Sequence, residues 1–467
     1  MNRAVALRPP SELAAFAPYG ALLVLALAAG LLIHPLGAIA IVALGLVVLA
    51  RPLDPPSALA AVAAVASFAN NEGGHMTRDL AIVCLFAVYA VASVWASGAL
   101  GRWRLPDARP LIPLALFFAW TFICAARGVA AGYSLRFLGL ELAGLLSLGF
   151  LVLGGGLSLD AQRLRPALWI LGFTGLVHVL LGIYSYQINH IRTGGVWYTP
   201  LSGMLALLMW SLALRAPTRI ARLQLALLTG LLLFHQLISF SRGYWLGLLV
   251  ALPWVSVTWA GRGEGSGERW RSLLRSMLLA LACMAVATVF VGLWFGWSDL
   301  LGLIGTRFAS SFSTKQASES ASNVARLIEY VASGRLIAQS PWIGHGLGLE
   351  LRIRQPIFNV ITRQWYVHHA YLWLWIKEGL VGLVLFVTVL VSAFRCCARG
   401  MRTLSGESSA WCAGAAGATL YLAVVNLTTF HFAQVNSNVA LGVMWGVALA
   451  LQRPDDLRIV WRDRKRP

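Results

Sequence analysis

Two adjacent histidines, His368 and His369, stand where a polar segment meets a long apolar run in YVHHAYLWLWIKEGLVGL. An imidazole can accept a proton from a sugar hydroxyl near neutral pH. The alternative is that both rings are interfacial side chains, like the tyrosines and tryptophans around them. Spacing alone does not separate these interpretations. It argues against a metal, because adjacent residues do not share a helix face and no clear carboxylate or cysteine partner stands at ligand spacing.

Arginines that precede glycine form a second group of candidate residues. Arg192 opens RTGG and Arg242 lies in SRG, each just before an apolar run. An arginine offers a planar, permanently charged fork to phosphate oxygens, and glycine lets backbone N–H groups approach the same oxygens. The sequence therefore favours an anion-binding role for both arginines. His190 is a weaker candidate, chosen because it is close to Arg192.

Three further arginines, Arg136, Arg326 and Arg335, stand on the same predicted surface, and of these Arg136 and Arg335 are secondary candidates. A single interfacial arginine usually extends to lipid headgroups or pairs with a carboxylate. For Arg136 we expect pairing, because Glu141 follows about one helical turn later. Arg326 and Arg335 belong to a long polar segment and remain candidates for binding.

The composition is that of a protein embedded in lipid. The chain has 467 residues, of which 58% are hydrophobic and 12% charged, and its mean hydropathy is +0.73. A soluble domain carries about twice that share of charge. Near-uncharged runs of about 15 to 20 residues recur throughout, which indicates an all-α polytopic membrane protein. The first apolar run leads into a second without a cleavage site, so we expect no cleavable signal peptide.

The apolar runs predict about 12–14 transmembrane helices, because two of the candidates are short and flanked by proline. The runs lie at 16–33, 36–50, 57–69, 80–98, 111–125, 138–156, 167–185, 199–214, 223–240, 243–259, 276–295, 368–394, 410–427 and 437–452.

Basic residues predict the orientation of the chain. The net charge is +19, from 37 Lys and Arg against 18 Asp and Glu. If the N-terminus is cytoplasmic and the runs alternate, 24 basic residues lie inside and 13 outside, seven of these in or beside one long loop. Long loops count little in this bias, so we expect both termini in the cytoplasm. The charge reports topology, and we predict no nucleic-acid partner.

One predicted outer connection is much longer than the others. Residues 296–366 form a polar loop, and loops of this size are usually functional. Within it, VARLIEYVASGRLIAQSPWIG has helical spacing and then a Pro-Trp-Ile-Gly stop, which predicts one or two short helices over the outer face. The chain accordingly divides into N-terminal transmembrane helices (1–295), this loop, C-terminal transmembrane helices (367–452) and a basic cytoplasmic tail (453–467).

The stretch from His368 resembles the signature of the O-antigen ligase and polymerase superfamily of bacterial inner-membrane glycan enzymes. That signature is a histidine, then Asn, Ser or Gln, then nine residues and Gly-x-x-Gly. Here nine residues separate His369 from Gly379-Leu-Val-Gly382, so His368 is in register. His369 departs from the small amide or hydroxyl side chain that the family prefers.

Three other stretches resemble segments of the same family. RTGGVWYTPLSGML is similar to an Arg-x-x-Gly segment before a helix, and SFSRGYWLGLL is similar to a Ser-Arg-Gly turn. ARLIEYVASGRLIAQSPWIGHGLG resembles the end of a large periplasmic loop, with an Arg-Leu opening and then Pro-x-x-Gly-x-Gly-x-Gly. The resemblance covers residues 185–395 and leaves the N-terminal third without a motif.

The resemblance implies a metal-independent glycosyltransferase, without a cofactor, on the periplasmic face of the bacterial inner membrane. Its donor would be a glycan on undecaprenyl diphosphate, bound among membrane lipid. Carried over by position, the diphosphate would be held by Arg192, Arg242 and Arg326, and His368 would act on or position the acceptor hydroxyl. Arginines that stabilise the leaving diphosphate can take the place of Mg²⁺.

The acceptor stays open at this point. A ligase would use lipid A–core, whereas a polymerase would use another lipid-linked repeat unit of an O-antigen or exopolysaccharide. Both share the donor site, and we favour the ligase. A transporter of the same lipid-linked glycan would favour charged residues at mid-membrane and broken helices related by a repeat. We see no convincing repeat, so we favour an enzyme whose arginines and His368 converge on one outer cavity.

Overall fold

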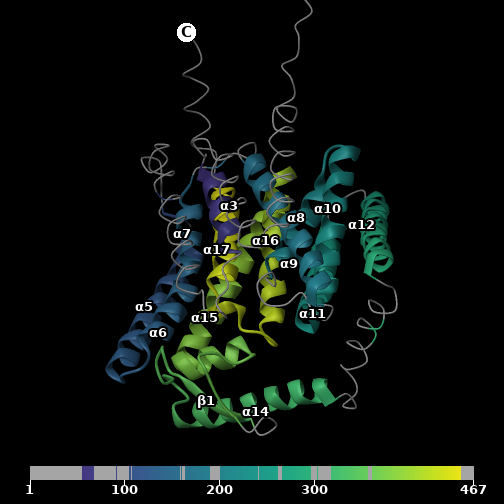
Figure 1. Cartoon of the computed structure of the whole chain (residues 1–467). Helices are drawn as coiled ribbons and strands as arrows, with labels where there is room; N and C mark the ends of the chain where they lie inside the picture. Colours follow the sequence, from purple (N-terminus) through teal and green to yellow (C-terminus); the bar gives the residue numbers. More distant parts are fainter. Residues whose placement is uncertain are drawn as a thin grey trace, which may run out of the picture.

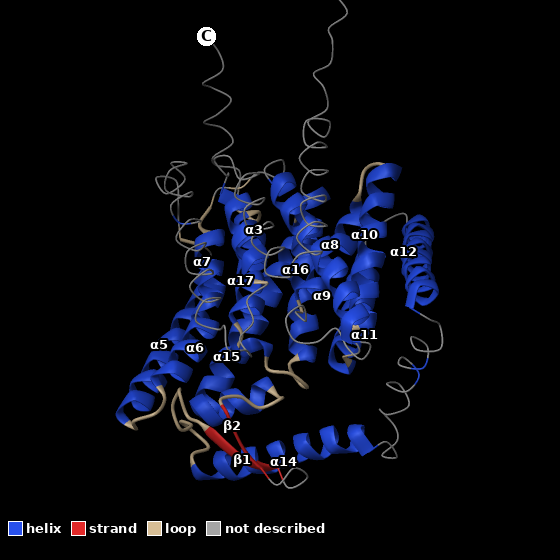
Figure 2. Ribbon diagram, viewed as in Figure 1, coloured by secondary structure: helices blue, strands red, loops and turns tan. Residues whose placement is uncertain are grey.

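The computed structural model describes residues 55–67, 91, 105–106, 108–157, 159, 164–189, 200–239, 241–260, 266–295, 302, 305, 317–355 and 360–453. Within these ranges the chain forms a bundle of helices, and one helix lies crosswise at one end of the bundle (Figure 1). A two-stranded sheet lies beside the crosswise helix (Figure 2).

The helices follow the apolar runs of the sequence, because a helix satisfies all its backbone polar groups within lipid. They are α3 (Pro55–Ala66), α5 (Ala108–Ala130), α6 (Leu135–Leu146), η2 (Ser147–Gly149), α7 (Phe150–Gly155), α8 (Leu164–Asn189), α9 (Leu201–Arg215), α10 (Arg219–Ile238), α11 (Arg242–Ala260), α12 (Ser266–Phe295), α14 (Ala317–Gln339), α15 (Ala370–Thr403), α16 (Gly406–Val425), η5 (His431–Ala433) and α17 (Val435–Ala450).

Eight helical stretches in the described part of the chain are long and apolar enough to cross a membrane. One of them, Leu135–Gly155, combines α6, η2 and α7. The shorter apolar helices α3, α9 and α17 belong to the same bundle. The predicted class, an all-α polytopic membrane protein, is confirmed. The predicted runs at 16–33 and 36–50, nearly all of 80–98 and nearly all of the tail lie outside the described residues.

The centre of the bundle is built from α9, α16 and α17, whose side chains are almost all buried. Small residues let these helices approach closely. A Cβ at Gly414 of α16 would press on the backbone of Leu208 in α9, and Gly446 of α17 touches Gly154 of α7. Close packing of this kind holds helices together in lipid, where the hydrophobic effect does not separate one apolar surface from another.

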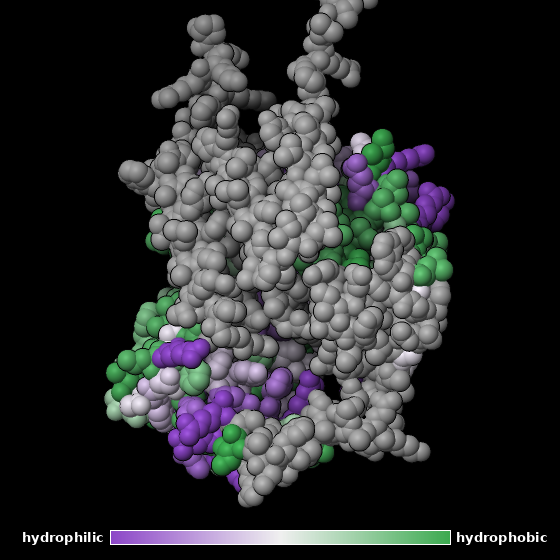
Figure 3. Space-filling model, in the orientation of Figure 1, coloured by the Kyte–Doolittle hydropathy of each residue, from purple (hydrophilic) through white to green (hydrophobic). Residues whose placement is uncertain are grey.

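The two ends of the bundle are formed by different elements. We call the end that carries α14 the α14 end; the turns between α10 and α11 and between α16 and α17 also lie there (Figure 1). Arginines at the starts of α5, α8, α10 and α12 and near the end of α15 lie at the opposite end. Figure 3 shows hydrophilic residues gathered at both ends and hydrophobic residues between them.

The long outer loop contains α14, a helix of 23 residues that lies across the end of the bundle (Figure 1). The sequence predicted one or two short helices at this place, and the single helix is longer than expected. The amide of Gly344 bonds to the carbonyl oxygen of Ser340 at 3.1 Å, which closes a turn after α14. This turn directs the chain back towards α15.

A β-hairpin follows the turn. Strand β1 (Leu351–Gln355) pairs antiparallel with β2 (Val360–Gln364), and β1 packs on α14. Leu351 and Ile353 of β1 are buried. No strand is predicted in this loop from the sequence, although LRIRQ alternates apolar and polar residues with the period of a strand. The signal was present, but five residues are too few to outweigh the helical pattern just before them.

Helix α15 bends sharply at Gly379, which has φ +72° and ψ −175°. Residues with a Cβ rarely adopt this conformation, and a Cβ here would overlap the carbonyl oxygen of Trp342. The turn after α14 fills the bend, because the N–H of Leu380 donates to the carbonyl oxygen of Pro341 at 2.9 Å. The bend therefore separates a short segment at the α14 end from the longer part of α15.

Candidate active site

His368 is held by a buried carboxylate from another element. Its Nδ1 lies 3.0 and 3.1 Å from the two carboxylate oxygens of Glu329, and its backbone N–H donates to Glu329 at 3.0 Å. Glu329 is 3% exposed and also accepts a hydrogen bond from Gln364 at 3.2 Å. Glu329 belongs to α14, while His368 directly precedes α15. We call Glu329 and His368 the dyad.

The carboxylate of Glu329 orients the imidazole of His368. Burial raises the pKa of Glu329, but the hydrogen bonds and charge of His368 outweigh burial and hold that pKa below its ordinary value. Glu329 is therefore ionised near neutral pH and accepts a hydrogen bond from Nδ1–H. In the neutral form of the ring, Nε2 of His368 is the acceptor, and the side chain is 38% exposed. Such a pair is suited to take a proton from a hydroxyl group.

His369 caps the start of a helix. It is the N-cap of α15, and its Nδ1 accepts from the N–H of Leu372 at 3.2 Å. The predicted run starts at residue 368, whereas α15 begins two residues later, at Ala370. Burial lowers the pKa of His369, which favours the neutral ring that this cap needs. Small amide and hydroxyl side chains are the usual N-caps, so the departure from the family signature preserves the cap.

Aromatic rings border the dyad. Tyr366 stacks on Phe430 with 3.8 Å between ring centroids, and both rings meet His368 edge-on. Tyr330 of α14 meets His369 edge-on at 5.8 Å. These rings exclude water from one side of the dyad, and a hydrogen bond is stronger where the local dielectric is low.

The connection 426–434 between α16 and α17 joins the dyad to the start of α11. On one side, the N–H of Ala370 donates to the carbonyl oxygen of Thr429 at 2.8 Å. On the other side, Gly243 of α11 lies so close to Thr428 that a Cβ would overlap the threonine hydroxyl. Two distant segments of the sequence therefore share one support at the α14 end.

Arg242 is the first residue of α11 and stands beside this connection. Tyr244 fixes the helix end through a hydrogen bond of 2.7 Å to Nε2 of His431, whose Nδ1 lies 2.5 Å from the side-chain oxygen of Gln434. Burial lowers the pKa of His431 to about 4, so the ring is neutral. Nδ1 then donates to Gln434, and Nε2 accepts from Tyr244. Arg242 is placed at the positive end of a well-anchored helix dipole.

Arg326 lies on the same face of α14 as the dyad. It precedes Glu329 by three residues and Tyr330 by four, the spacing of neighbours on a helix surface. Arg335 follows Glu329 by six residues, which puts it on another face, and it is exposed. Helix α14 therefore brings Arg326 to the dyad and leaves Arg335 outside.

Glu141 does not pair with Arg136, so the expected pairing is wrong. Glu141 is fully buried; its Oε1 lies 2.5 Å from Nζ of Lys377, and its Oε2 accepts from the N–H of Gly348 at 2.6 Å. Lys377 also donates to the carbonyl oxygen of Leu349 at 2.6 Å. Arg136 is exposed near the start of α6. Lys377, although distant in sequence, pairs with Glu141 because its amine reaches the buried carboxylate, whereas Arg136 stays exposed.

A buried ion pair and a bent helix are also features that the transporter interpretation favours. Here protein atoms enclose both the ion pair and the bend of the helix. The side chains of Lys377 and Glu141 are 0% exposed, and the turn after α14 fills the bend at Gly379. Their effect is to fasten the outer loop to the bundle.

Two glycine motifs, PWIGHGLG and Gly379-Leu-Val-Gly382, meet where the outer loop contacts the bundle. Gly344, in the segment PWIGHGLG, has φ +63°, and a Cβ there would overlap the backbone nitrogen of Gly379. The N–H of Gly346 donates to the carbonyl oxygen of Lys377 at 2.8 Å. Arg127 of α5 donates to the carbonyl oxygen of Gly344 at 2.9 Å. The contact between the motifs sets where α14 lies on the bundle, and thus brings the two halves of the dyad together.

Arg192 and His190 lie outside the described residues, so their places remain predictions. The next described residue is Pro200, and α9 begins at Leu201. This start agrees with the apolar run predicted at 199–214.

Part of the chain matches a known family. Residues 227–387 match the family model described as O-Antigen ligase. Over these residues the chain is similar to the O-antigen ligase superfamily. The matched region runs from α10 into α15 and contains Arg242, Arg326 and His368, whereas Arg192 precedes it. No curated protein matches the chain.

This similarity supports a ligase- or polymerase-type, glycosyltransferase-like function, with lipid-linked glycans as the general class of partner. The match includes α14, the hairpin and the bend of α15, which are the elements that assemble the dyad.

Glu329 and the connection 426–434 are not among the residues predicted from the sequence. Glu329 stands one helical turn after Arg326 in a helix of mostly small and apolar residues, and that isolation was a usable signal. The connection reads NLTTFHFAQ, where polar and aromatic residues interrupt two apolar runs. Such a cluster is typical of a packed turn.

Proposed function

We propose that the chain transfers a glycan from undecaprenyl diphosphate to an acceptor hydroxyl, with lipid A–core as the acceptor. The observation that carries the proposal is the Glu329–His368 dyad, with Arg326 one helical turn away on α14. An acceptor for a hydroxyl proton and fixed cations for a diphosphate are the groups that this transfer needs. The family match supports the same class of reaction.

His368 acts on the acceptor in this proposal. The acceptor hydroxyl oxygen bonds to the anomeric carbon of the donor sugar, and the bond from that carbon to the diphosphate oxygen breaks. The hydroxyl proton passes to Nε2 of His368, and ionised Glu329 stabilises the resulting imidazolium. A positioned general base of this kind contributes roughly 10²- to 10⁴-fold to the rate.

The arginines act on the donor. The leaving diphosphate gains negative charge as its bond to the sugar breaks, and Arg192, Arg242 and Arg326 meet that charge with charge-assisted hydrogen bonds. Each such contact lowers the barrier by about 2–4 kcal/mol, if it resembles a donor in an oxyanion hole. Fixed guanidinium groups perform the task that Mg²⁺ has in other phosphate chemistry, so the proposed reaction needs no metal ion.

The proposal places the α14 end in the periplasm and both termini in the cytoplasm of a bacterial cell. The arginines at the opposite end of the described helices support this orientation, because connections rich in Lys and Arg stay in the cytoplasm. The lipid-linked donor then reaches the dyad from the outer leaflet of the inner membrane.

Complementation of a strain that lacks this gene tests the proposal. Lipopolysaccharide is separated by gel and secreted polysaccharide is assayed in parallel for wild type, His368→Ala, Arg242→Ala and Arg326→Ala. We expect each variant to lose long O-chains from lipid A–core while polymerised lipid-linked glycan accumulates. Arg335→Ala is the matched control, because it removes the same side chain from another face of α14, and it is expected to behave as wild type.

Other outcomes separate the alternatives. If single repeats remain on the lipid carrier, or if secreted polymer is lost while O-chains persist, the acceptor is a lipid-linked repeat and the protein is a polymerase. If the His368 and arginine variants all behave as wild type, the catalytic proposal fails and transport of the lipid-linked glycan becomes the better explanation.

A further inference from the structure

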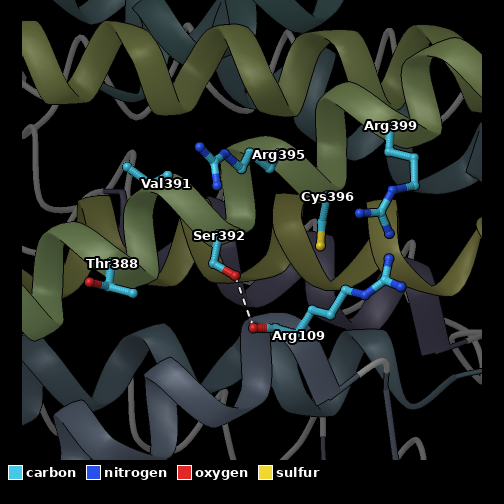
Figure 4. A pocket seen from close by; sticks show the side chains of 7 residues that line it. All are labelled: Arg109, Thr388, Val391, Ser392, Arg395, Cys396 and Arg399. Carbon is cyan, nitrogen blue, oxygen red and sulfur yellow. Dashed lines mark hydrogen bonds between the residues drawn. The ribbon is translucent and has the colours of Figure 1, made fainter.

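A cavity lies between α5 and α15 at the end of the bundle opposite α14, away from the dyad. Its volume is about 260 Å³. Figure 4 shows the side chains that line it: Arg109, Thr388, Val391, Ser392, Arg395, Cys396 and Arg399. Clefts that enclose whole drug-sized ligands are typically about 300–1,000 Å³, so this one suits a small polar group with part of the ligand outside.

The sequence of α15 brings these side chains to one face. Ser392, Arg395 and Arg399 follow one another at intervals of three and four residues, which places them on one stripe of a helix. The hydroxyl of Ser392 donates to the backbone carbonyl oxygen of Arg109 at 2.9 Å, and this bond fixes the start of α5 against α15. The cavity is therefore a built feature of the contact between two helices.

Positive charge is concentrated in the cavity. Three of its seven lining residues are arginines, and Figure 4 shows the guanidinium groups of Arg109 and Arg399 turned towards one another. All three arginines are exposed. Guanidinium groups that share a small space favour an anion between them, and the planar fork of arginine matches the oxygens of a phosphate.

Apolar surface continues from the arginines along both helices. On α15, Val384, Val387 and Val391 are 54%, 38% and 42% exposed and recur at helical spacing. On α5, Ile112 and Leu116 are 58% and 54% exposed. Both helices are long and apolar enough to cross a membrane, so these side chains face acyl chains. A ligand that combines a phosphate with acyl chains satisfies both parts of the surface.

We propose that the α5–α15 cavity binds the headgroup of an anionic phospholipid from the leaflet at this end of the bundle. The phosphate contacts the arginines, and the acyl chains lie along the exposed valines of α15. Basic pockets between transmembrane helices commonly bind lipid headgroups in this way. The site is separate from the proposed glycan site, and it does not depend on the proposed reaction.

Native mass spectrometry of the full chain in detergent tests this site. The protein is mixed with phosphatidylglycerol or with phosphatidylethanolamine of the same acyl chains, and bound lipid is counted. We expect wild type to retain phosphatidylglycerol in preference. Arg395→Gln/Arg399→Gln is expected to weaken retention about 25-fold, since each basic residue near an anionic lipid contributes roughly fivefold. Arg109→Gln tests the α5 side of the cavity independently.

A matched control is available on α12. Arg271 and Arg275 are also exposed, have the same four-residue spacing and lie at the same end of the bundle, but they do not line the cavity. Arg271→Gln/Arg275→Gln is expected to retain phosphatidylglycerol within twofold of wild type. Thermal unfolding without added lipid confirms that each variant is folded.

Two results would overturn the proposal. In the first, the α12 control loses as much lipid as the cavity variant, which would mean that only general surface charge matters. In the second, excess inorganic phosphate displaces the bound lipid, which would assign the cavity to free phosphate. Continued retention of lipid in excess phosphate supports a lipid site.

Discussion

Glu329 of α14 and His368, just before α15, form a carboxylate–imidazole contact of 3.0 Å that joins the crosswise helix to the membrane bundle. The same carboxylate accepts the backbone N–H of His368, so both the ring and the chain are fixed. A single buried acid thus orients the proposed base and attaches the loop that carries Arg326. The same contact therefore holds α14 in position and orients His368 for the proposed reaction.

Glu329→Gln tests the chemical half of this relationship. Glutamine has nearly the same shape, but it lacks the negative charge that stabilises an imidazolium. We expect transfer activity to fall roughly 10²- to 10⁴-fold, by analogy with acids that orient catalytic histidines. The measurement is glycan transfer by purified protein in membranes. Binding of the lipid-linked donor should change little, and an equal loss of donor binding would indicate a structural role instead.

The attachment of α14 to the bundle should weaken at low pH. The pKa of Glu329 is lowered from its ordinary value of 4.5 in the folded protein. Its stabilising effect is therefore complete above pH 4.5 and is lost as pH falls through the lower folded pKa. We expect amide exchange in α14 of wild type, measured relative to the intrinsic exchange rate at each pH, to accelerate below pH 4.5. In Glu329→Gln this acceleration should be much smaller, and equal acceleration in both proteins would point to other carboxylates.

The adjacent histidines should respond differently to the same substitution. Asparagine at position 369 keeps an N-cap acceptor for Leu372, so His369→Asn should retain activity and stability. His369→Ala should reduce the free energy of unfolding by about 0.5–2 kcal/mol. His368→Asn should retain stability better than activity. Parallel melting and transfer assays distinguish these cases, and loss of activity in His369→Asn with normal melting would assign His369 a chemical role.

Gly379→Ala tests the bend of α15. Its φ of +72° with ψ near −175° is strained for any residue with a Cβ, which costs about 1–3 kcal/mol, and overlap with Trp342 adds to this. We expect a lower melting temperature and faster proteolysis of the outer loop. Gly139→Ala is the control, because Gly139 is helical, exposed and has open space around its Cβ position. It should be neutral or stabilising by up to about 1 kcal/mol.

Lys377→Met tests the buried ion pair. Removing the lysine leaves the carboxylate of Glu141 buried without its cation, and such changes typically cost about 3–5 kcal/mol. The double variant Lys377→Met/Glu141→Gln removes both charges and should recover much of that loss. Thermal unfolding in detergent measures both variants. If the double variant is no more stable than the single one, the unpaired charge of Glu141 is not the cause of the loss.

Much of the fold could be predicted because backbone polar groups inside a bilayer must form hydrogen bonds within the protein. Apolar runs become helices wherever the chain must satisfy its backbone inside lipid, and the runs from 111–125 to 437–452 all correspond to described helices or parts of them. The hairpin was missed because Leu351–Gln355 packs on α14 and pairs with Val360–Gln364, and no local pattern reports these contacts.

The candidate site was predictable only in part. Arg242, Arg326 and His368 were chosen from residue type, neighbouring glycines and the family signature, and all three lie at the α14 end. The partner of His368 was not found, because Glu329 is 39 residues away and the contact needs the bend at Gly379. For the same reason Glu141 was assigned to a near arginine instead of the distant Lys377.

The sequence by itself determined the class of protein, the course of the membrane helices, the long outer loop and the residue types able to hold phosphate or accept a proton. These follow from hydropathy, helical period and side-chain chemistry, which are local properties. Only the tertiary structure decided that Glu329 orients His368, that His369 caps a helix and that Lys377 neutralises Glu141. Those pairings depend on burial and on contacts between distant segments, and close packing between helices permits only certain side chains to meet.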